Sequence, residues 1–133
     1  MVDFKKELGK KYDEIVKLGF LKDLEEMVSN EGIISIELED IKKVLSCDIV
    51  GTISEIIDDP NQELKMNRLS NSMPTDCIVN FIGSKDITIV QISEVIENIR
   101  KLMSSDINIL YGVMVNEGLG NKLKIQALFT HTN

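Results

Sequence analysis

Aromatic residues and cysteine are scarce in this 133-residue chain. It contains no tryptophan, two tyrosines, four phenylalanines and two cysteines. The core must therefore rest on Ile, Leu, Val and Met. Cys47 and Cys77 both lie in apolar, strand-like sequence, and we expect them to be buried reduced thiols rather than a disulfide. A hydrophobic fraction of 43% and a charged fraction of 28% are those of a globular protein, which excludes a disordered chain.

Basic residues are also few: the chain has 15 Lys and Arg against 22 Asp and Glu, which gives a net charge of −7. Nucleic acids and anionic membranes need clustered Lys and Arg, so we expect neither as a partner. No apolar run reaches the roughly 18 residues of a membrane span, and the first residues lack the apolar stretch of a signal peptide. We therefore expect a cytoplasmic protein.

Metal-site spacing of His, Cys and carboxylates is absent as well, so we expect no metal and no cofactor. The length is that of one domain, long enough to bury a core without metal or disulfides.

Helical periodicity marks four segments. Apolar residues recur every three or four positions from Phe4 to Val28, which predicts one long amphipathic helix, weakened by Gly9 and Gly19. Residues 39–45 predict a short helix with acidic residues at its start. Asp59 and Pro60 suit the start of a polar helix over residues 59–70. The clearest helical stripe runs over residues 92–103.

Strand patterns occupy residues 47–56, 76–82, 107–115 and 123–130, and residues 32–38 form a short extended segment or loop. The order predicts an α/β fold of the two-layer α+β sandwich kind. After a long and a short helix, a β-α-β-α-β-β series would build a four-stranded mixed sheet covered by helices. Strand–helix–strand units predict parallel crossovers, and the turn at 116–122 predicts a closing hairpin.

This order, and several short sequences within it, resemble the carboxy-terminal domain of FtsZ, a bacterial division protein of the FtsZ/tubulin family. Residues 32–42 (Gly-Ile-Ile-Ser-Ile-Glu-Leu-Glu-Asp-Ile-Lys) are similar to the family's Gly-Leu-Ile-Asn-Leu-Asp-Phe-Ala-Asp-Val-Lys. Further similarities are residues 77–81 with Val-Leu-Val-Asn-Ile, 86–89 with Asp-Leu-Thr-Leu, 108–113 with Asn-Ile-Ile-Phe-Gly-Ala, and 117–121 with Glu-Ser-Leu-Gly-Asp. The resemblance implies a helix over residues 1–30 similar to the FtsZ core helix and a carboxy-terminal-like domain over 31–133.

The glycine-rich loop with which FtsZ binds GTP is not found in this sequence. Such a loop leads into a helix whose amino-terminal N–H groups hold phosphate. Here the nearest pattern, Gly118-Leu119-Gly120, opens a predicted strand instead. We therefore expect no GTP binding by this sequence and no enzyme activity of its own.

The resemblance does imply a contribution to a partner's site. In the FtsZ/tubulin family, the loop after the core helix inserts acidic residues beside the nucleotide of the next subunit, where they polarise water. The family's Asn falls on Ser35, its first Asp on Glu37 and its second on Asp40, and only Asp40 is unchanged. Two interpretations stay open: a catalytic loop acting in trans, or a helix-start carboxylate at Asp40 with a solvated Glu37.

The leading hypothesis is an FtsZ-like assembly module in cell division or a related cytoskeletal process. It would bind or cap an FtsZ-type GTPase, or join a separately encoded GTP-binding half, and a homo-oligomer is possible. The alternative is a small-ligand-binding or regulatory domain on a recycled scaffold, with a pocket between the turn at 116–122 and the strand ends.

Overall fold

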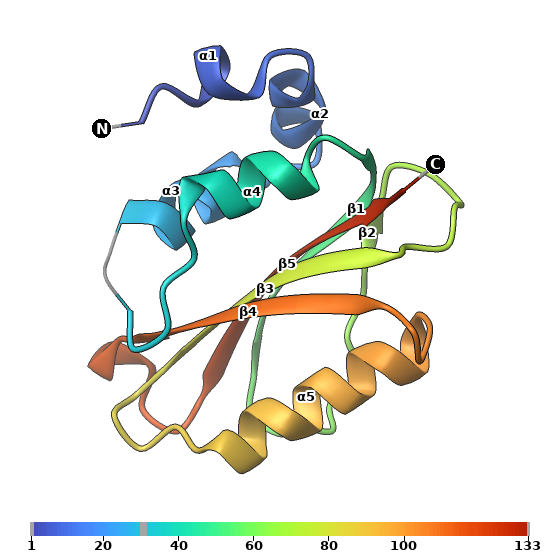
Figure 1. Ribbon diagram of the computed structural model, residues 1–133. Coiled ribbons are helices and arrows are strands. Elements are labelled where there is room, and N and C mark those ends of the chain that lie inside the picture. Colours follow the sequence, from blue (N-terminus) through green and yellow to red (C-terminus); the bar gives the residue numbers. More distant parts are fainter. Residues whose placement is uncertain (1, 30–31, 133) are drawn as a thin grey trace.

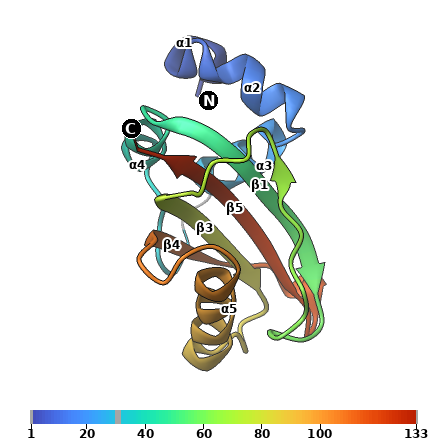
Figure 2. The ribbon, with the colours of Figure 1, turned by 90° about the vertical axis from the view of Figure 1, so that its right-hand side faces the viewer.

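The computed structural model describes residues 2–29 and 32–132, and it contains a mixed sheet with helices on both faces (Figure 1, Figure 2). The predicted domain boundary at residues 30 and 31 lies outside these ranges. The helices are α1 (Phe4–Leu8), α2 (Lys11–Lys17), α3 (Leu21–Ser29), α4 (Leu38–Val44), α5 (Ile89–Leu102) and the 3-10 helix η1 (Glu117–Leu119). The strands are β1 (Asp48–Ile57), β2 (Asn67–Arg68), β3 (Asp76–Gly83), β4 (Asn108–Val115) and β5 (Leu123–His131).

The predicted α+β class is confirmed, and the four predicted strands all form. A fifth strand arises because the two residues of β2 pair with Gly51 and Thr52 of β1. The sheet order is β2-β1-β5-β3-β4, and α5 connects the parallel pair β3 and β4 as predicted.

The predicted closing hairpin is wrong. β5 lies between β1 and β3 and is antiparallel to both, while β4 lies at the edge beyond β3. The two strands β1 and β3 therefore run in the same direction without being neighbours. Burial explains the arrangement, because β5 is buried along nearly its whole length, as a central strand must be, whereas the first half of β4 is exposed or half-buried.

The predicted single amino-terminal helix is also wrong. Three short helices form instead, separated at Gly9 and Gly19, whose φ angles are +55° and +69°. Such left-handed angles end a helix and suit glycine, which has no Cβ to clash. The breaks let α1 and α2 turn away from the line of α3 (Figure 1).

No helix forms over residues 59–70, contrary to prediction. The carboxylate of Asp59 accepts the N–H of Asn61 at 2.9 Å within a tight turn, instead of capping a helix. Only Leu64 is buried among residues 61–68, so a helix here would have had no apolar stripe to pack. By contrast, α4 is confirmed, and α5 is confirmed with a start three positions earlier, because the Thr88 hydroxyl caps it by accepting the Gln91 N–H at 3.2 Å.

Two hydrophobic clusters lie on opposite faces of the sheet. One packs Ile92, Val95 and Ile99 of α5 onto the strands, and the other packs α1 to α4 onto them. Cys77 is buried, which raises the pKa of its thiol, whereas Cys47 is only half-buried, contrary to expectation. Among the described residues, no helix has both the length and the apolar character needed to cross a membrane.

Candidate assembly surface

The segment at residues 32–37, between α3 and α4, lies along the outer edge of β4. The N–H of Ile34 donates to the Val113 carbonyl at 3.2 Å, and the Val113 N–H donates to the Ile34 carbonyl at 2.8 Å. This single bridge, between residues far apart in the sequence, fixes the segment to the sheet.

Two glycines allow that close approach. A Cβ on Gly112 would lie 2.7 Å from Cγ1 of Ile36 and 2.9 Å from the carbonyl oxygen of Ile34, which is closer than real Cβ contacts. A Cβ on Gly32 would likewise collide with the Val113 carbonyl oxygen. Gly112 lies inside a strand predicted from the sequence, and a glycine at such a position indicates the close approach of another backbone.

Two of the predicted site residues, Ser35 and Glu37, lie in this segment, and the third, Asp40, lies in α4 directly after it. The buried Ile36 anchors the segment between Ser35 and Glu37, whose side chains are exposed, and Asp40 is half-buried in the first turn of α4. One carboxylate oxygen of Asp40 accepts the backbone N–H of Glu37 at 3.1 Å, as in a capping box. Asp40 thus has a structural role at the helix start, and Glu37 is the more accessible of the two carboxylates.

Exposed apolar side chains flank the same segment, which the sequence did not single out as a surface. Ile33 is 68% exposed, Ile34 40% and Val115, at the end of β4, 43%. We call residues 32–37, Val115 and η1 the loop end of the molecule; they gather at one end of the sheet (Figure 1). An apolar surface with an exposed carboxylate is suited to contact another protein.

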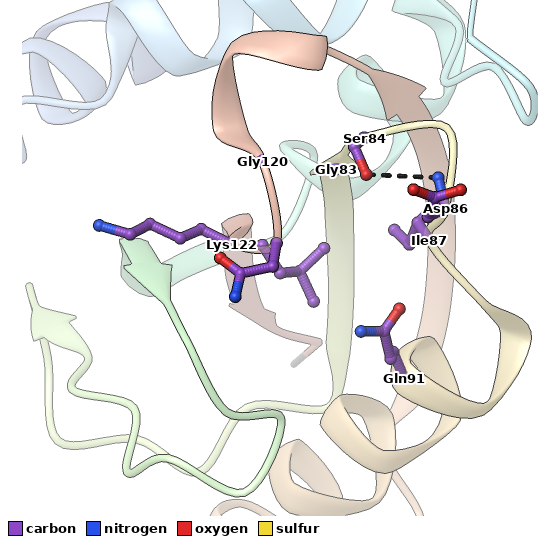
Figure 3. A pocket seen from close by; sticks show the side chains of 9 residues that line it. Gly83, Ser84, Asp86, Ile87, Gln91, Gly120 and Lys122 are labelled. Carbon is purple, nitrogen blue, oxygen red and sulfur yellow. Dashed lines mark hydrogen bonds between the residues drawn. The ribbon is translucent and has the colours of Figure 1, made fainter.

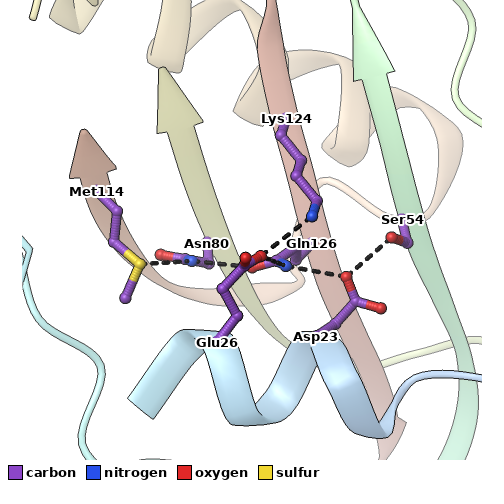
Figure 4. Close-up of polar contacts among 7 residues, drawn as sticks. All are labelled: Asp23, Glu26, Ser54, Asn80, Met114, Lys124 and Gln126. Carbon is purple, nitrogen blue, oxygen red and sulfur yellow. Dashed lines mark hydrogen bonds and ion pairs between the residues drawn. The ribbon is translucent and has the colours of Figure 1, made fainter. Parts of the chain in front are cut away.

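A polar cluster beneath α3 holds in place the helix that precedes the loop end (Figure 4). Asp23 accepts hydrogen bonds from Ser54 and Gln126, both at 2.9 Å. Glu26 accepts from Gln126 at 2.6 Å and from Lys124 at 3.1 Å. α3 is therefore fixed to β1 and β5 by directional contacts as well as by burial.

The cluster continues across the sheet through Asn80 of β3. Its amide nitrogen donates to Gln126 at 3.0 Å and to the sulfur of Met114 at 3.4 Å. The amide oxygen of Asn80 is buried and has no hydrogen-bond partner among the residues that the structure describes.

A small pocket lies where the turn after η1 meets the end of β3 and the start of α5 (Figure 3). Its volume is about 190 Å³, below the roughly 300–1,000 Å³ of small-molecule sites. The turn predicted to line a pocket does so through Gly120, Asn121 and Lys122. The described residues contain no group of three or more His, Cys, Asp or Glu placed to hold a metal ion.

A family model described as FtsZ family, C-terminal domain, matches residues 49–133. The predicted site residues Ser35, Glu37 and Asp40 precede the matched part. No curated protein matches the chain.

Solved structures show the same fold. An empty FtsZ dimer from M. jannaschii has 19% sequence identity and a TM-score of 0.59, and the match covers 90% of this chain and 38% of that one. An FtsZ point mutant from M. jannaschii has 20% identity and a TM-score of 0.59, over 92% of this chain and 40% of that one. CetZ from Methanosaeta thermophila has 16% identity and a TM-score of 0.58, and the match covers 92% of this chain and 38% of that one. The chain therefore spans about two fifths of the length of these proteins.

Proposed function

Because the chain belongs to the FtsZ family through its C-terminal domain, we propose that it is an assembly module that binds or caps an FtsZ-type partner through its loop end. One observation carries the proposal: a segment fitted by glycines to the edge of β4 presents an exposed carboxylate beside exposed apolar side chains. The resemblance implies that the equivalent family loop meets the nucleotide of the next subunit.

The nucleotide would come from the partner. Gly118 lies within η1 and Gly120 ends it, and the chain then enters β5 rather than a helix. The turn therefore lacks the helix amino terminus that holds phosphate in nucleotide-binding loops. We infer that this domain contributes to GTP hydrolysis at most in trans.

Within that contribution, Glu37 and Asp40 would have different roles. Glu37 is exposed and can approach a water molecule on a partner's nucleotide, whereas Asp40 holds the start of α4 through the Glu37 N–H. The extra methylene of Glu37 relative to the family's Asp displaces its carboxylate by about 1 Å, and a displacement of that size can cost about 10²-fold in rate. A weak stimulation of the partner's GTPase is therefore expected.

The test mixes the purified chain with FtsZ from the same organism and follows GTP hydrolysis and polymer sedimentation against its concentration. Ile33→Asp should weaken co-sedimentation by about tenfold or more, because it places a charge in an apolar contact. Glu37→Gln should leave co-sedimentation intact and abolish any change in hydrolysis. Met73→Ser, at an exposed apolar residue away from the loop end, is the matched control and should change neither.

The proposal fails if the chain neither co-sediments nor alters hydrolysis. It also fails if Met73→Ser weakens co-sedimentation as much as Ile33→Asp does.

A small-ligand function has one observation in its favour, the pocket lined by Gly120, Asn121 and Lys122. Its size limits it to a ligand of a few heavy atoms. A rise in melting temperature with one compound of a metabolite panel, lost in Lys122→Ala, would favour this function. If no compound of the panel raises the melting temperature, the small-ligand function is not supported.

A further inference from the structure

A groove runs along the outer side of α5, beside the segment that follows β1. It consists of two adjoining hollows of about 350 and 180 Å³, which share Asn61, Asn98 and Lys101 as lining residues. The amide nitrogen of Asn98 donates to the Pro60 carbonyl at 2.7 Å and ties the segment to the helix. The smaller hollow lies between α5 and residues 61–64, whereas Asn61 is the one residue outside α5 that lines the larger hollow.

Apolar side chains are exposed along this groove. Ile89 and Val90, in the first turn of α5, are 62% and 61% exposed, and Leu102, in the last turn, is 48% exposed. They are not part of the core, which α5 contacts through Ile92, Val95 and Ile99. Exposed apolar side chains at both ends of a helix indicate a surface for a partner.

The charge of the groove is negative. Glu63, Glu94 and Glu97 line it, and Lys101 is the basic residue among the lining residues. None of these three glutamates forms an ion pair with a residue that the structure describes. A partner with basic residues would supply the missing counter-charges.

Residues 59–70 form a turn and an extended segment, so α5 is the single helix on its face of the sheet within the described chain. α5 has 14 residues and is therefore about 21 Å long. A second helix of three to four turns would match that length and pack beside it at about 8–10 Å.

We propose that this groove binds an amphipathic helix of another protein, whose apolar stripe contacts Ile89, Val90 and Leu102 and whose flanking Lys and Arg face the three glutamates. This is recognition of a helix in a groove, with anchors at intervals of three and four residues. A second copy of the chain is a poor occupant, because a net charge of −7 on each copy opposes association at an acidic surface. Its lining residues differ from those of the loop end, and the proposal does not rest on the function proposed there.

The experiment uses two labelled synthetic peptides of 14 residues and the full chain. One peptide has Leu at positions i, i+3, i+4 and i+7 and Lys elsewhere; the other has the same Leu pattern with Glu in place of Lys. Fluorescence anisotropy should show binding of the Leu/Lys peptide that weakens as salt is raised, and no binding of the Leu/Glu peptide. NMR shift changes on binding should map to α5 and residues 58–64.

Paired variants separate the apolar and charged parts of the groove. Ile89→Ser with Val90→Ser should weaken binding of the Leu/Lys peptide by about tenfold or more, and Glu94→Gln with Glu97→Gln should reduce its salt dependence. Ile89, Val90 and Glu97 are exposed and Glu94 is half-buried, so both pairs should keep the melting temperature near that of the parent. Met73→Ser is the control and should bind the peptide unchanged.

Several results would overturn the proposal. These are failure of the Leu/Lys peptide to bind, equal binding of the Leu/Glu peptide, or shift changes confined to other elements. A chain that is dimeric in solution and becomes monomeric with Val90→Ser would also overturn it, because a second copy would then be the occupant.

Discussion

Both faces of the sheet have an apolar cluster, but the face covered by α3 adds a buried polar cluster to it. On the face covered by α5, the strands contribute apolar side chains such as Val79 and Phe81 of β3 and Ile125 of β5. On the face covered by α3, the neighbouring positions of the same strands include Asn80 and Gln126, which bind each other and the carboxylates of the helix. Close packing of apolar side chains stabilises without strong directional preference, whereas hydrogen bonds between buried groups fix a particular arrangement.

The two helices have different surroundings. α5 covers one face of the sheet with its apolar side, and the groove lies on its outer side. α3 precedes the loop end, which the bridge between Ile34 and Val113 joins to β4. The polar cluster fixes α3 to β1 and β5.

The largest expected effect tests the apolar face. Phe81→Ala removes a fully buried ring that also contacts Tyr111 edge to face at 6.2 Å, and it should lower the free energy of unfolding by about 3–5 kcal/mol. Urea denaturation monitored by circular dichroism measures the loss. A loss below about 1 kcal/mol would mean that the face repacks around the cavity and that burial there is not what stabilises the sheet.

A smaller effect is expected on the polar face. Asp23→Ala removes the acceptor of the Ser54 and Gln126 hydrogen bonds at a largely buried site. It should therefore lower the free energy of unfolding by about 1–3 kcal/mol. Asp23→Asn keeps an acceptor oxygen and should cost less. A cycle with Ser54→Ala isolates the coupling between the two side chains. If Asp23→Ala lowers the free energy of unfolding more than Phe81→Ala does, the expected order is reversed and the polar cluster contributes more to stability.

The smallest effect concerns Asp76, at the start of β3 and outside both clusters. Partial burial raises its pKa, but hydrogen bonds from Thr75 and Thr132, both at 2.8 Å, and from Asn108 outweigh that effect and hold the pKa below the usual value. Because the folded pKa is the lower one, this stabilisation is present above about pH 4, the unfolded value, and is lost as the pH falls further.

Asp76→Asn should therefore flatten the acid side of the stability curve. Urea midpoints measured from pH 7 to pH 3 should fall less steeply than in the parent. The difference between the two curves measures the contribution of Asp76. Parallel curves for parent and variant would show that Asp76 does not contribute.

Local patterns predicted the strands, α4 and α5, because β-branched runs and a helical stripe are properties of adjacent residues. The predictions were wrong where the structure depends on pairing between distant residues or on backbone φ angles. The placement of β5 between β1 and β3 depends on pairing across the whole sheet, and the breaks at Gly9 and Gly19 depend on φ angles that periodicity does not report.

The candidate sites divide in the same way. The resemblance placed Ser35, Glu37 and Asp40 together, and the helix-start role of Asp40 was one of the two interpretations drawn from the sequence. The exposed Ile33 and the groove along α5 were not predicted, because exposure depends on what the folded chain leaves uncovered.

The central place of β5 has a consequence for biosynthesis. Asp48 of β1 pairs with His131 of β5, and β5 is synthesised after the other strands of this sheet that the structure describes. Until then β1 and β3 have no partner between them, and their apolar edges are open to other chains. Pairing between residues so distant in sequence is also slow to form. We therefore expect the nascent domain to depend on chaperones until β5 closes the sheet.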